Sequence, residues 1–272
     1  MKMNKIAFVV ISALCVFTFF SCDLLEKPLL EQIGLGDVLQ YAPDAENLSS
    51  ADTVTLANAA GDISIAADPV ASKAVLEALS SKGATAVTGN KISNEQKNNI
   101  LSLTTATVLP IDEIVNVAVG AMSSESSSSN NSSTQDVITR MIDSIQTVDT
   151  RATEAILLEK VPSNTAAANI TDEELNNVLL ATVSVAISAC KSAGEDVDIE
   201  STEFGNAMTE FMKVFDNDHR NEVNVNTIVN NLGISGNKVD SISNAITIFQ
   251  RLGNKASAET LMGMFTGGMG ND

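Results

Sequence analysis

The chain has 272 residues, with 34 acidic and 16 basic side chains and a formal net charge of −18 at pH 7. So acidic a chain is poorly suited to nucleic acid, because affinity for a phosphate backbone comes from neutralising phosphates with lysine and arginine. One tyrosine and no tryptophan argue against a platform that stacks sugars on aromatic rings. The length is ample for a sizeable core, as one large domain or two small ones.

The first 22 residues have the layout of a bacterial export signal. Lys2 and Lys5 form a short positive region, and the run 6–20 that follows is almost wholly apolar. The run is too short for a transmembrane helix, which needs about 20 apolar residues. It ends at Ser21, directly before Cys22. A small residue before a cysteine at the end of such a run resembles the lipobox of bacterial lipoproteins, in the looser form of spirochaetes and especially treponemes.

This resemblance implies that residues 1–21 are cleaved and that Cys22 is acylated. The mature chain is then exported and held in the cell envelope by its acyl chains, on the periplasmic face of the inner or outer membrane or at the cell surface. Each buried methylene contributes about 0.8 kcal/mol, so two or more chains anchor a protein stably without a membrane span. Secretion with cleavage near Ser21 and an uncleaved anchor are the alternatives. Cys15 is a poorer acceptor, because the apolar run continues past it.

Apolar residues recur at helical spacing along most of the chain, which predicts an all-α fold, a bundle or array of about ten short helices. Helix starts are marked by Asp68-Pro69 and by capping-box patterns at 93–96 and 171–174. Short alternating stretches at 53–56 and 62–65 leave a small strand pair as the alternative there. The helices are expected at 30–40, 51–60, 69–82, 94–109, 112–122, 135–160, 172–192, 202–215, 224–232, 238–252 and 256–265.

The expected layout is a signal peptide at 1–21, an N-terminal helical region at 22–122 and a flexible serine-rich loop at 123–133, then a C-terminal helical region at 134–266 and a disordered tail at 267–272. The serine-rich loop either separates two subdomains or lies within one array, and the shortness of the helices on both sides favours one array. The stretch 175–190 is apolar all round, so we expect it to be the core helix of the C-terminal half.

Asp216, Asp218 and Glu222 form the best-looking candidate for a metal site, because their spacing faintly suggests a calcium loop. An EF-hand requires glycine at its sixth position and glutamate at its twelfth, where this chain has Asn221 and Thr227. A polar turn between helices explains the acidic residues as well and is the favoured interpretation.

Catalytic and cofactor motifs are absent from the sequence. His219 is the only histidine, and no nucleophile motif, zinc motif or phosphate-binding lysine loop accompanies it. Cys190 lies in an apolar run and is interpreted as a small buried hydrophobe. The sequence therefore predicts neither a catalytic site nor a cofactor.

One apolar stripe could serve either as core or as a binding face. It consists of Phe204, Met208, Phe211, Met212 and Phe215, and we call it the Met/Phe stripe. Helical spacing predicts core faces first, whereas an exposed stripe would mark a contact with protein, lipid or ligand. The leading hypothesis is a non-enzymatic lipoprotein that acts as a structural or protein-interaction module of the envelope. The alternative is a carrier of lipid or another apolar ligand, with a cavity lined by Met and Phe.

Overall fold

The computed structural model describes residues 48, 50–109, 145–192, 201–216 and 218–256. The chain divides into two compact units, and all of these residues except 109 and 145 belong to the unit built from 41–108 and 146–257. They form eleven α-helices and four short 3-10 helices, and this part of the chain contains no strand. The predicted all-α fold is therefore confirmed.

The N-terminal part of this unit is a series of helices linked by short turns. Asp52 and Asp62 each accept hydrogen bonds from the first turn of a helix, so both stretches for which a strand pair was left open are helical. Asp68 caps the next helix in the same way, with Pro69 at its first position, as the sequence predicts. The elements are α5 (Thr53–Ala59), α6 (Ile63–Ala66), α7 (Pro69–Ser81), α8 (Ala84–Val87), η1 (Gly89–Lys91) and α9 (Asn94–Val108).

The C-terminal part follows the predicted order of helices. Its elements are α12 (Arg151–Lys160), α13 (Asn164–Ala168), α14 (Asp172–Lys191), α15 (Thr202–Met212), η2 (Lys213–Phe215), η3 (Arg220–Glu222), α16 (Val225–Asn231), α17 (Asn237–Leu252) and η4 (Gly253–Ala256). Most expected boundaries are right to within about two residues. Helices α6, α8 and α13 were not predicted, because four or five residues are too few to show a helical period. The expected helices at 30–40 and 112–122, the serine-rich loop and the chain beyond 256 lie outside the described residues.

One expected helix is wrong at its start. The sequence predicts a helix over 135–160, but residues 145–150 are not helical and α12 begins at Arg151. Ile145 and Val148 fit the helical spacing, yet both are buried in chain that forms no regular secondary structure. The physical reason is that side chains of other helices bind the backbone here, as described below.

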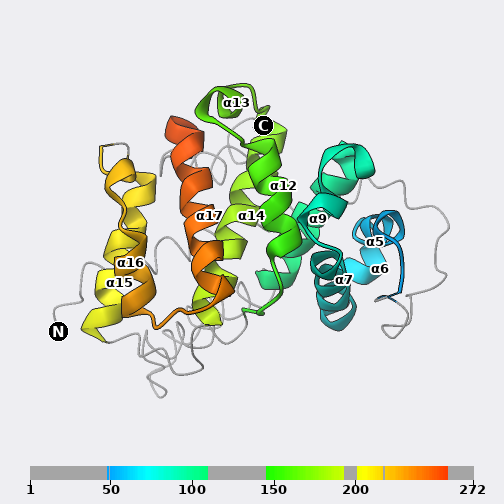
Figure 1. The fold of residues 1–272 in the computed structure, drawn as a ribbon, viewed down its shortest axis with the longest axis horizontal. Helices are drawn as coiled ribbons and strands as arrows, with labels where there is room; N and C mark the ends of the chain where they lie inside the picture. The colour runs from blue at the N-terminus through cyan, green and yellow to red at the C-terminus, as the bar shows by residue number, and fades with distance from the viewer. Residues whose placement is uncertain (1–47, 49, 110–144, 193–200, 217, 257–272) are drawn as a thin grey trace, which may run out of the picture. The chain divides into compact units, whose positions relative to one another are not determined.

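Helix α14 lies at the centre of this unit. It packs against α9 on one side and α17 on another, and it also contacts α12 (Figure 1). Its burial on nearly every side confirms the expected core helix, although its contact with α9 makes it part of the core of both halves. The hydroxyls of Thr182 and Ser184 bond carbonyls one turn back in the same helix, which satisfies these buried polar groups.

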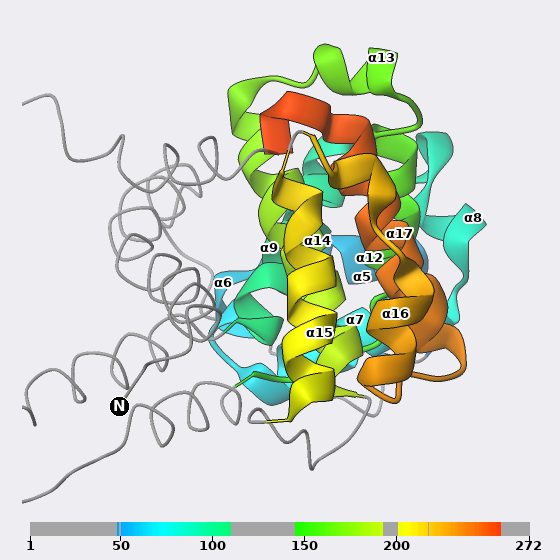
Figure 2. The same ribbon diagram turned by 90° about the vertical axis from the view of Figure 1, so that its left-hand side faces the viewer.

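Helices α15 and α16 pack against each other beside α17 (Figure 2). Helix α16 and η2 make most of the contacts of this pair with α17, and α15, which packs mainly on α16 and η2, reaches α17 through Phe211. The Met/Phe stripe lies on α15 and η2, so this pair of helices determines its surroundings. Among the described helices, none has both the length and the apolar character needed to cross a membrane.

Candidate functional site

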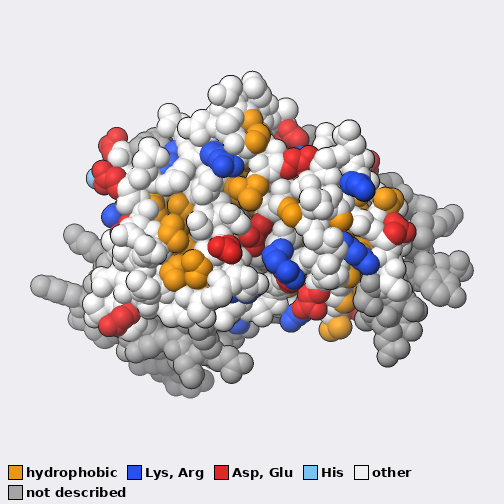
Figure 3. Space-filling model, in the orientation of Figure 1, with side chains coloured by type: hydrophobic (Ala, Val, Ile, Leu, Met, Phe, Trp, Pro, Cys, Tyr) orange, Lys and Arg blue, Asp and Glu red, His pale blue; other side chains and the backbone are white. Residues whose placement is uncertain are grey.

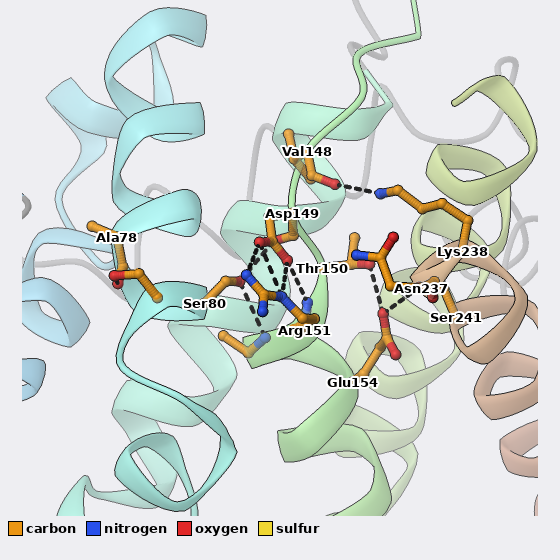
Figure 4. Close-up of polar contacts among 12 residues, drawn as sticks. Ala78, Ser80, Val148, Asp149, Thr150, Arg151, Glu154, Asn237, Lys238 and Ser241 are labelled. Atoms are coloured by element: carbon orange, nitrogen blue, oxygen red, sulfur yellow. Dashed lines mark hydrogen bonds and ion pairs between the residues drawn. The ribbon is translucent and has the colours of Figure 1, made fainter. Parts of the chain in front are cut away.

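A segment without helical or strand structure at residues 146–150, which we call the strap, is bonded to side chains from four helices, α7, α12, α14 and α17 (Figure 4). The main chain of Val148 is the best-held part. Its N–H donates to Ser188 Oγ of α14 at 3.1 Å, and its carbonyl accepts from the same hydroxyl at 3.3 Å. Lys238 Nζ of α17 donates to that carbonyl at 3.4 Å. Side chains thus replace the backbone partners that a helix or a sheet would supply.

The end of the strap joins the start of α12 to α7. Ser80 Oγ of α7 donates to the carbonyl of Asp149 at 2.8 Å and accepts from the N–H of Ala152 at 3.2 Å. The Asp149 carboxylate accepts from the backbone N–H and the guanidinium of Arg151. Burial opposes ionisation of Asp149, but the hydrogen bonds and charge of Arg151 outweigh it, so the pKa of this carboxyl lies below its ordinary value.

The carboxylate of Glu154 connects the strap, α12 and α17. Its side chain is buried, with 5% of the residue exposed, and none of its three hydrogen-bond donors carries a charge. Oε1 accepts from Thr150 Oγ1 and from Ser241 Oγ, both at 2.7 Å, and Oε2 accepts from Asn244 Nδ2 at 2.8 Å. Because both oxygens are bonded and screened from water, this network fastens helices and is not arranged for chemistry on a substrate.

A polar cleft of about 430 Å³ lies at the start of α9, lined by residues 89–94 with Lys97 and Glu159. Lys97 is 4% exposed. Its Nζ donates to the carbonyl of Gly89 at 2.7 Å and to Glu159 Oε1 at 3.0 Å, while that carboxylate also accepts from the Gly89 N–H. The volume lies within the range of small-molecule sites. The charged groups, however, bind each other and the backbone N–H and carbonyl of Gly89, so the pair holds η1 against α9 and α12.

The acidic residues predicted as weak metal candidates lie on an exposed turn. Asp216 Oδ2 bonds His219 Nδ1 at 2.8 Å, and Asp216 Oδ1 accepts from the N–H of Asp218 at 2.9 Å. The bond between carboxylate and imidazole raises the pKa of His219 and lowers that of Asp216. Glu222 is exposed. Within the described residues, no three carboxylate, histidine or cysteine side chains are placed to hold a metal ion. The polar-turn interpretation accounts for the geometry.

The Met/Phe stripe is half-buried and partly stacked on the core. The rings of Phe211 and Phe215 lie edge-on at 5.9 Å, and both pack edge-on against Phe249 of α17, at 6.4 Å and 5.1 Å. Phe249 is fully buried. Edge-to-face packing at these distances is the favoured arrangement of aromatic rings in a core. Phe211 and Phe215 therefore fill space beside α17, which favours core packing for this end of the stripe.

Of the two cysteines considered in the mature chain, the structure describes Cys190 but not Cys22. Cys190 lies near the end of α14 with a free thiol, and burial raises its pKa to about 12. The thiol is therefore neutral at physiological pH and is a poor nucleophile. Cys22, the predicted acylation site, lies outside the described residues.

On the face drawn in Figure 3, hydrophobic side chains gather in one cluster left of the centre of the view, and elsewhere they are interspersed with acidic and basic groups. Val54 and Val70 are the exposed large hydrophobic residues in the described ranges, and single exposed apolar side chains are ordinary in soluble domains. Comparison of the chain with protein-family models, with curated proteins and with solved structures yields no match.

Proposed function

We propose that this chain is an exported bacterial lipoprotein, anchored in the cell envelope by acyl chains on Cys22. The observation that carries the proposal is the order of residues 1–22: lysines, an apolar run, a small residue and then cysteine. The anchor lets the helical unit work at a membrane without a span of its own. The envelope would be of the spirochaete type, because the form of the lipobox resembles theirs.

We further propose that the helical unit is a structural or protein-interaction module and not an enzyme. In the described part of the chain, the acid, thiol and imidazole that are the clearest candidates for chemistry are engaged in structural bonds or poorly placed for it. Glu154 is taken up by three structural donors, and the Cys190 thiol is buried and neutral. His219 bonds Asp216 on an exposed turn. Nucleophilic catalysis requires a nucleophile within hydrogen-bond reach of a base in a protected site, and these three groups offer no such pairing.

The Met/Phe stripe decides between an interaction module and a carrier of apolar ligands. A carrier needs the stripe to line an empty cavity. Two of its rings instead pack against Phe249, at 6.4 Å and 5.1 Å, so part of the stripe contributes to the core. This packing supports the module. Protein partners would then bind through helix faces.

Metabolic labelling with a palmitate analogue in a bacterium that processes lipoproteins tests the anchor. We expect the wild-type chain to be labelled and Cys22→Ser to lose the label. Cys190→Ser is the matched control and should keep it, because that thiol is buried in α14. A labelled Cys22→Ser protein, or a wild-type chain that is never labelled, contradicts the proposal.

Native mass spectrometry of the purified protein separates the module from the carrier. We expect the mass of the mature chain with its acyl groups and no additional bound lipid. A stoichiometric lipid that co-purifies with the chain, and that is absent from a Phe211→Ala/Phe215→Ala variant, would favour the carrier.

A further inference from the structure

The strap is held differently from the helices around it. Its main chain makes one backbone hydrogen bond to a distant part of the chain, from the Gln146 N–H to the Val108 carbonyl at 3.3 Å. The remaining cross-links come from side chains, with Ser80, Ser188 and Lys238 bonding Val148 and Asp149. The neighbouring helices keep their own backbone bonds whether or not the strap is in place, so its departure does not unravel them.

The side chains beneath the strap can also be exposed to solvent at little cost. The groups that bond its backbone are two hydroxyls and an ammonium, all of which water can satisfy. The hydroxyl of Ser188 has the same local alternative that Ser184 already uses, a carbonyl one turn back in its own helix. The apolar contribution of the strap is limited to Val148, and Ile145, the buried residue directly before the strap, is the one further large apolar side chain that its release would disturb.

Thr150 provides a fixed end about which the strap can turn. Its carbonyl accepts the N–H of Glu154 at 2.8 Å, and its hydroxyl donates to the Glu154 carboxylate at 2.7 Å. Both bonds lie within the first turn of α12. They remain intact when residues 146–149 move away.

We propose that the strap is a releasable element of the fold: residues 146–149 swing away about Thr150 while α7, α9, α12, α14 and α17 stay folded. Release uncovers Ser80, Ser188 and Lys238. It follows the pattern of local openings, which involve segments with few buried apolar contacts and have lower free energies than global unfolding. The inference is independent of the lipid anchor, because every group it uses lies inside the helical unit.

Amide-resolved hydrogen exchange on the full chain, followed by NMR at low denaturant concentrations, tests this release. We expect the Val148 amide to exchange at least about tenfold faster than the slowest amides of α14 and α17. Its exchange should also be nearly independent of denaturant, because a small opening exposes little surface. A Val148 amide that exchanges at the same rate and with the same denaturant dependence as α14 would overturn the proposal.

Two serines of α14 form a matched pair for the same experiment. Ser188 and Ser184 are both fully buried, but Ser188 bonds the strap and Ser184 bonds Leu180 of its own helix. We expect Ser188→Ala to speed exchange at Val148 by about tenfold or more, the effect of losing both hydrogen bonds of its hydroxyl to Val148, and to leave α17 unchanged. Ser184→Ala should leave Val148 unchanged. Equal effects of the two variants at Val148, or equal acceleration of Val148 and α17 in Ser188→Ala, would count against a releasable strap.

Discussion

Helices α9 and α12 lie side by side in the unit, yet their first turns are completed in opposite ways. At α9, Ser93 Oγ accepts from the Gln96 N–H at 3.1 Å, and Gln96 Oε1 accepts from the Ser93 N–H at 2.7 Å, so four consecutive residues complete the cap. At α12, the Thr150 side chain makes no cap bond. The Ala152 N–H is instead satisfied by Ser80, which lies 72 residues earlier. One helix carries its own starting signal, and the other receives its start from tertiary structure.

Among the variants that test this contrast, removal of the Glu154 carboxylate should have the largest effect on the free energy of unfolding. Glu154→Ala removes the acceptor of the buried Thr150 hydroxyl and the half-buried Asn244 amide, and leaves the Ser241 hydroxyl only its longer bond to the Asn237 carbonyl at 3.4 Å. We expect it to lower the free energy of unfolding by about 3 kcal/mol. Urea unfolding followed by circular dichroism measures this loss. Glu154→Gln is the control and should be milder, because its amide oxygen still accepts from the hydroxyls. A loss below about 0.5 kcal/mol for the alanine variant would contradict this account of the network.

Substitution of Ser80 should have the next largest effect on stability, because this side chain of α7 bonds the first turn of α12. Ser80→Ala removes an acceptor from the Ala152 N–H and a donor to the Asp149 carbonyl. We expect a loss of about 1.5 to 2 kcal/mol, the effect of two buried hydrogen bonds. Ser81→Ala is the neighbouring control. Its hydroxyl bonds the Ala78 carbonyl of its own helix, so its loss should stay below about 0.5 kcal/mol. Similar losses in the two variants would show that Ser80 has no special role at α12.

Ser93 tests the helix that starts by its own signal. Ser93→Ala should cost about 1 kcal/mol, the usual effect of losing an N-cap side chain. Because the α9 cap shares no bond with the α12 start, the double variant Ser80→Ala/Ser93→Ala should equal the sum of the single losses to within about 0.5 kcal/mol. Coupling well beyond that margin would mean that the two helix starts form as one unit.

The same contrast explains which parts of the fold the sequence predicts. Helix α9 was placed correctly because its cap and its apolar spacing lie within one stretch of chain. The start of α14 is an intermediate case. Thr171 caps the Glu174 N–H as predicted, but the Glu174 side chain pairs with Lys160 of α12 and does not close the box. The start of α12 was misplaced because no residue near 150 signals that Ser80 completes its first turn.

The candidate functional residues also fall into those that neighbouring residues mark in the sequence and those that only the fold brings together. Cys22 is marked by neighbouring residues, so sequence patterns can indicate it. The bonds of Glu154 come from Thr150 nearby and from Ser241 and Asn244 of α17, and neither of those two has any sequence relation to the carboxylate that a motif could capture. The Met/Phe stripe was found by its helical spacing. Only its contact with Phe249 shows that part of it belongs to the core.

The smallest expected effect is a difference in pH dependence between the two helix starts. The stability that Asp149 contributes at the start of α12 should depend on pH, whereas the stability that the α9 cap contributes should not. The folded-state pKa of Asp149 is lowered, so this carboxyl contributes stability that is present above its unfolded pKa of about 3.9 and is lost as the pH falls through the folded value. Asp149→Asn should therefore lower the unfolding free energy at pH 7 by less than about 1 kcal/mol, since its partner Arg151 is exposed. The variant should approach the wild type as the pH falls below about 4.

The capping bonds of α9 are made by Ser93 and Gln96, neither of which ionises, so Ser93→Ala should reduce stability by the same amount at pH 7 and below pH 4. Urea titrations of both variants and the wild type at a series of pH values give, for each variant, the loss in unfolding free energy as a function of pH. Because only the Asp149 difference is expected to close in acid, parallel curves for both variants would show that the Arg151 contact contributes nothing to the start of α12. A Ser93→Ala difference that closes in acid would instead show that the α9 cap depends on a charged group, such as Glu95 in its first turn.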